Sequence, residues 1–83
     1  MPRYFFHFDC PAGRLRDEVG VPLPDAEAAW YQAVRSARER IETAAVPAAA
    51  DWEHASVEIM QEGGLPVDRV PLIEIARFQY GAR

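Results

Sequence analysis

The chain has 83 residues, of which 49% are hydrophobic and 27% are charged. This length fits a single domain, residues 1–83, whose core buries roughly 60–65% of the unfolded chain's surface, and the composition is too apolar for a disordered protein. The net charge of −4 lacks the basic excess of nucleic-acid-binding domains, so the sequence does not favour direct binding of DNA or RNA.

Residues 3–9 are aromatic and predict a β-strand. Its side chains alternate, so that one face carries Tyr4, Phe6 and Phe8 and the other carries Phe5 and His7. Because both faces are apolar, we expect this strand near the centre of a sheet.

A turn at residues 10–13 leads into a polar stretch, residues 14–19, that predicts a second strand. Its charged side chains suit the edge of a sheet, where they discourage pairing with other chains. Gly20 and Pro22 are expected to end this strand, and the two strands together form a hairpin.

A helix is predicted over residues 26–45. Asp25 is a favourable N-cap, and Pro47 disfavours helical geometry in the residue before it. Apolar residues recur with the helical period and predict one stripe against the sheet, with Trp30 as a core residue: Ala26, Ala29, Trp30, Ala33, Val34, Ala37, Ile41 and Ala44.

A second hairpin follows the helix. Residues 54–62 alternate as in a strand, Gly63-Gly64 predicts a tight turn, and residues 65–70 return, with Pro66 indicating an edge or strand-end position. The segment from 72 to 83 is a tail whose structure stays open, because residues 72–80 suit a helix or a further strand equally.

The predicted fold is therefore α+β, in the order β-β-α-β-β, with one long helix packed on one face of an antiparallel sheet. A single helix covers only one face, while Phe5 on the other face and the tail from residue 72 are both apolar. We expect a homodimer through the uncovered face or through the tail; a tail folded back over its own sheet is the alternative.

Two motifs stand out, MPRYFFH at residues 1–7 and DEVGVPLPD at residues 17–25. Together they resemble a family of very short bacterial proteins that is described only as a domain of unknown function. Its members open with a similar strand and carry a similar D-x-x-G-x-x-L-P-D helix entry, and the likeness covers most of residues 1–72. The resemblance implies no activity, cofactor or catalytic residue.

Few residues suggest chemistry. His7 and Asp9 share one strand face, and a neighbouring strand could add His54 or Glu58 to form a divalent-metal site. The plainer interpretation is that His7 packs its ring and forms a hydrogen bond at its tip. Cys10 is the only cysteine and lysine is absent, so we assign no catalytic, cofactor-binding or metal-binding residue and expect no enzyme and no cofactor.

We interpret the chain as a non-enzymatic protein-interaction or accessory module, either homodimeric or bound to a protein partner. It is expected in the cytoplasm, because it has neither a signal peptide nor a membrane-spanning stretch. The candidate interaction surface comprises Phe5, His7, Trp52, Phe78 and Tyr80. Two alternatives remain: an antitoxin-like or regulatory domain with a nucleic-acid-linked partner, and a metal-dependent or enzymatic role through His7 and Asp9.

Overall fold

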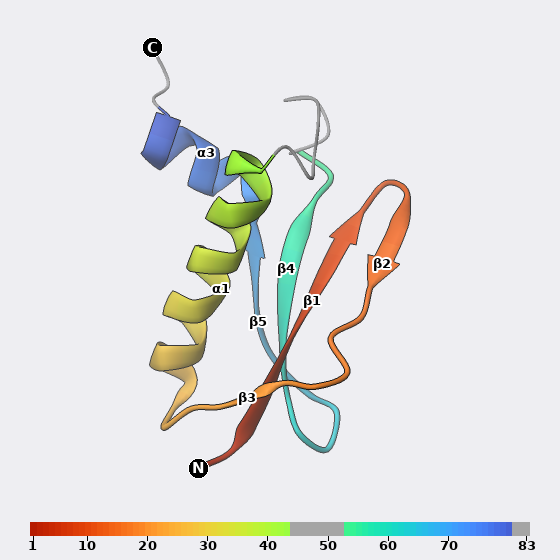
Figure 1. The fold of residues 1–83 in the computed structure, drawn as a ribbon, viewed down its shortest axis with the longest axis vertical. Coiled ribbons are helices and arrows are strands. Elements are labelled where there is room, and N and C mark those ends of the chain that lie inside the picture. The colour runs from red at the N-terminus through yellow and green to blue at the C-terminus, as the bar shows by residue number, and fades with distance from the viewer. Residues whose placement is uncertain (44–52, 81–83) are drawn as a thin grey trace.

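A computed structural model describes residues 1–43 and 53–80, with the side chains of residues 1–43 and 53–77. Its elements are β1 (Arg3–Cys10), β2 (Gly13–Leu15), β3 (Val21–Pro22), α1 (Ala26–Glu42), β4 (Ser56–Gln61), β5 (Leu65–Pro71) and α3 (Leu72–Tyr80). The strands form one antiparallel sheet in the order β2-β1-β4-β5, and β3 pairs with β1 as well. Both helices lie on one side of this sheet (Figure 1). The predicted α+β fold is confirmed.

Strand β1 is central, as predicted, because β4 pairs with one of its edges while β2 and β3 share the other. The predicted strand over residues 14–19 is too long, since β2 ends at Leu15. The chain then leaves the sheet and returns as β3, which the sequence analysis did not anticipate. Between these two short strands, the carboxylate of Asp17 accepts the N–H of Phe6 at 3.1 Å. The Asp17 side chain therefore accepts the backbone N–H that a continuous strand would have bonded.

Helix α1 begins as predicted, with Asp25 as N-cap accepting the N–H of Ala28 at 2.9 Å, and it ends at Glu42. The prediction that Trp30 lies in the core is wrong, because Trp30 is 41% exposed. Three fully buried alanines, Ala29, Ala33 and Ala37, form the contact with the sheet instead. Small side chains let the helix approach closely, which leaves the bulky ones on its flanks. There Trp30 packs edge-on against Tyr31, with 5.3 Å between ring centroids.

The second hairpin is confirmed, with Gly63 and Gly64 both at positive φ in its turn. The tail forms the helix α3, one of the two structures that the sequence left open. Its buried Leu72 and Ile75 join the core beneath α1, so it does not fold over the opposite face of the sheet. Neither α1 nor α3, nor any other helix within residues 1–43 and 53–80, is long and apolar enough to cross a membrane.

Candidate functional site

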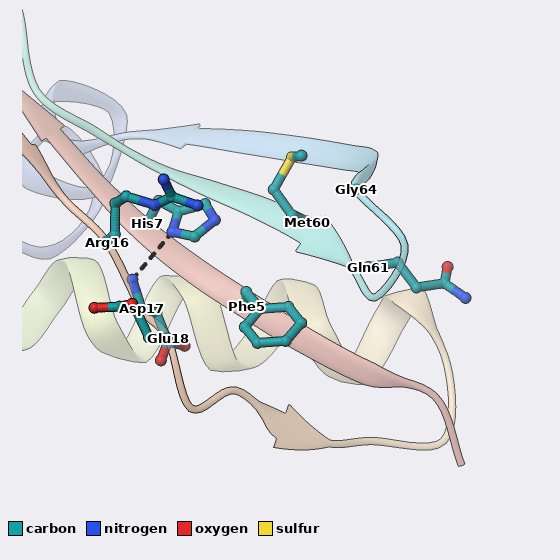
Figure 2. A pocket seen from close by; sticks show the side chains of 8 residues that line it. All are labelled: Phe5, His7, Arg16, Asp17, Glu18, Met60, Gln61 and Gly64. Carbon is teal, nitrogen blue, oxygen red and sulfur yellow. Dashed lines mark hydrogen bonds between the residues drawn. The ribbon is translucent and has the colours of Figure 1, made fainter.

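The face of the sheet that turns away from the helices carries the candidate site. The cross-strand register between β1 and β4 places Phe5 opposite Met60 and His7 opposite Glu58. Figure 2 shows the first three of these side chains on the near face of the sheet, with α1 behind it. Two predicted surface residues, Phe5 and His7, thus share this face. Trp52 lies outside the described residues, and Phe78 and Tyr80 belong to α3 with side chains outside the described part.

Four charged side chains form an alternating ring across this face, which we call the ion-pair ring: Asp9, Arg14, Glu58 and Arg69. Arg14 holds Asp9 with two hydrogen bonds, at 2.6 and 2.9 Å, and also contacts Glu58. Arg69 contacts Asp9 at 2.8 Å and Glu58 at 3.2 Å. In the order of the strands across the sheet, β2 carries Arg14, β1 carries Asp9, β4 carries Glu58 and β5 carries Arg69. The ring therefore links the sheet across its whole width.

The ion-pair ring keeps Asp9 ionised. The hydrogen bond from Arg14 lowers the pKa of this carboxyl group most. Burial raises the pKa and the hydrogen bond from Arg69 lowers it further, so that the pKa of Asp9 falls to about 2. Both carboxylates of the proposed metal site, Asp9 and Glu58, therefore already contact two guanidinium groups. His54 precedes β4 and is exposed. Among the described residues, no group of three or more histidine, cysteine, aspartate or glutamate side chains is placed to hold a metal ion.

Asp17 anchors the segment between β2 and β3. Its carboxylate accepts backbone N–H groups from Phe6 at 3.1 Å, Val19 at 3.1 Å and Gly20 at 3.0 Å. Burial raises the pKa of this carboxyl group, but the three backbone hydrogen bonds outweigh burial, so the pKa lies below its usual value. Asp17 is therefore a structural anchor, which agrees with the turn hydrogen bonding that the sequence suggested for it beside an edge charge.

His7 is locked to the same segment. It is 7% exposed, and its Nδ1 accepts the backbone N–H of Asp17 at 3.1 Å (Figure 2). Since Nδ1 acts as an acceptor, the neutral ring carries its proton on Nε2. This matches the plainer interpretation from the sequence, in which His7 packs its ring and hydrogen-bonds at its tip.

Next to His7, the face is hollowed into a pocket of about 360 Å³. Its walls are partly apolar and partly charged (Figure 2), and the lining residues are Phe5, His7, Arg16, Asp17, Glu18, Met60, Gln61 and Gly64. Arg16 and Glu18 are both exposed. Neither has a hydrogen bond or ion pair with any residue in the described part of the chain. The pocket thus combines an apolar wall with two opposite charges, those of Arg16 and Glu18, that are unpaired within the described residues.

Sequence reasoning named two of the residues that line this pocket, Phe5 and His7, and missed the other six: Arg16, Asp17, Glu18, Met60, Gln61 and Gly64. Arg16 and Met60 carry no local signal, because their positions depend on how β1 pairs with β4 and with the segment after β2. Asp17 did carry one, since it opens the motif at residues 17–25. In the structure, Gly20 of that motif has a φ of 74° and donates its N–H to Asp17, so the spacing reflects a turn closed by a carboxylate.

The chain matches one family of known sequences. The model of DUF6894, a domain of unknown function, matches residues 3–73. This range includes every strand of the sheet, helix α1 and all residues that line the pocket. No curated protein and no solved structure matches the chain.

Proposed function

The chain belongs to the DUF6894 family, and we propose that it is a non-enzymatic protein-interaction module that binds its partner through the uncovered face of its sheet. The observation that carries this proposal is the placement of both helices on the opposite face, which leaves Phe5 and Met60 partly exposed around a hollow. An apolar centre surrounded by charged and polar groups is the usual composition of a protein interface.

The alternative way for a sheet to bind a protein is to add a strand at its edge, and the outer edge of β5 is poorly suited to that. Pro66 and Pro71 have no N–H to offer a new strand. The N–H of Arg69 is already taken by the side chain of Asp68 at 2.8 Å. Such devices are typical of edge strands that are protected against pairing.

The opposite edge is closed by different means. Of the strands in residues 1–43 and 53–80, only the short β2 and β3 lie there, and the segment between them runs outside the sheet. Where β1 is not covered by a strand, Asp17 occupies the N–H of Phe6. Neither edge of the sheet is therefore suited to adding a strand, and this supports the uncovered face as the binding surface.

A photo-crosslinking residue tests this proposal in the protein's own cells. We expect benzoyl-phenylalanine at position 60, on the uncovered face, to form a defined protein crosslink. The matched control is the same residue at position 31, because Tyr31 is aromatic, 63% exposed and on helix α1, on the other side of the sheet. Crosslinks of equal yield from both positions, or none from position 60, would contradict the proposal.

A further inference from the structure

We infer that the partner on the uncovered face is a second copy of this chain, with Arg16 of each copy paired to Glu18 of the other. This inference rests on the proposed function, since it names the partner of that same face. Both residues line the rim of the pocket and both are exposed. Within the described residues neither has an ion-pair partner, so each charge is free to meet one from outside.

Symmetry makes this pair of charges suited to self-association. In a two-fold dimer every contact occurs twice, because residue i of one copy meets residue j of the other and j meets i. One positive and one negative charge on the same rim can therefore form two ion pairs across the axis. Two like charges on the rim would instead repel each other, and a partner of single charge sign would satisfy only one of them.

The remainder of the face supports the same partner. The ion-pair ring contains two arginines and two carboxylates and is neutral as a unit, although the whole chain carries a net charge of −4. Two copies can thus bring these faces together without the repulsion that two acidic surfaces would cause. Phe5 and Met60, which are partners in the β1–β4 register, supply an apolar centre beside the rim.

The test is a charge-reversal cycle followed by light scattering and sedimentation over micromolar concentrations. Wild type is expected as a dimer. Each single reversal, Arg16→Glu or Glu18→Arg, converts both cross-axis pairs into repulsions and should raise the dimer dissociation constant about tenfold or more. The double variant Arg16→Glu/Glu18→Arg restores opposite charges, so its constant should return to within about threefold of wild type.

A matched control separates this effect from net charge. Arg35→Glu changes the net charge as Arg16→Glu does, but Arg35 is exposed on α1, away from the face, and this variant should dimerise as wild type does. A wild-type monomer at all concentrations, or a double variant no tighter than the singles, overturns the inference. If position 60 crosslinks only to a different protein, the second-copy inference fails while the proposed function stands; if position 60 gives no crosslink, both fail.

Discussion

Removal of the Asp17 carboxylate should destabilise the fold, because this group replaces a strand at the edge of β1. Asp17→Ala leaves three backbone donors without their acceptor, those of Phe6, Val19 and Gly20. The Phe6 and Gly20 bonds are partly buried, whereas the Val19 bond is exposed and water can replace it. At about 1–2 kcal/mol for each partly buried donor and little for the exposed one, the expected loss in the free energy of unfolding is about 2–4 kcal/mol.

This loss is large relative to the free energy of unfolding of the whole domain. A domain of this length is stabilised by about 4–12 kcal/mol, so Asp17→Ala should shift the midpoint of urea unfolding strongly. Asp17→Asn keeps one neutral oxygen as an acceptor and should lose about half as much as Asp17→Ala. The control is Glu39→Ala, because Glu39 is exposed on α1 and its side chain has no hydrogen bond or ion pair within the described residues. A loss below about 0.5 kcal/mol for Asp17→Ala, equal to that of the control, would refute the anchoring role.

The same anchor predicts a dependence on pH. The pKa of Asp17 is lower in the folded chain than its ordinary value of about 3.9. The folded state therefore binds this proton less tightly than the unfolded state does. The resulting stabilisation is fully present above about pH 4 and is lost as the pH falls through the lower folded pKa. The stability gap between wild type and Asp17→Asn should narrow on acidification below pH 4; a gap independent of pH would contradict this.

Two further predictions concern packing, and both are checked by urea unfolding. A methyl group on Gly20, whose φ is 74°, would lie 2.9 Å from the backbone oxygen of Tyr4. Gly20→Ala should therefore cost about 2–4 kcal/mol in the free energy of unfolding. Gly64 has a similar φ but nothing within 4 Å of such a methyl group, so Gly64→Ala should cost about 1–2 kcal/mol from backbone strain alone. Trp30→Ala should cost about 1–3 kcal/mol, because Trp30 is 41% exposed and only its buried part loses contacts. Leu72→Ala removes a fully buried side chain and leaves a cavity, so it should cost more, up to about 5 kcal/mol. Equal losses for Gly20→Ala and Gly64→Ala would contradict the close contact at Gly20. Equal losses for Trp30→Ala and Leu72→Ala would contradict the different burial of these two side chains.

Local signals in the sequence were sufficient for the elements that depend on neighbouring residues. The N-cap at Asp25 and the turn at Gly63-Gly64 each rest on a side chain or φ angle that a few adjacent residues decide. The central place of β1 followed from its two apolar faces. The N-cap and the turn were confirmed because no distant part of the chain competes with them.

Features that depend on distant pairing could not be read in the same way. Strand β3 has only two residues and exists because Val21 meets Tyr4 across β1. The burial of Trp30 was predicted from the helical period, but the period alone cannot distinguish the centre of a stripe from its flank. Ala33 occupies the centre here, since close contact with the sheet selects the smallest side chain.

The charged residues of the uncovered face show what residue types alone leave undecided. Asp9 and Glu58 lie on neighbouring strands, as metal ligands often do, but both have their charge matched within the ion-pair ring. A cation that bound them would first have to displace a guanidinium group. Arg16 and Glu18 differ, because no ion pair within the described residues would have to break before they bind. A partner that supplies the two opposite charges therefore gains both ion pairs at no cost to the fold, which is why the rim of the pocket, and not the ion-pair ring, is where we place recognition.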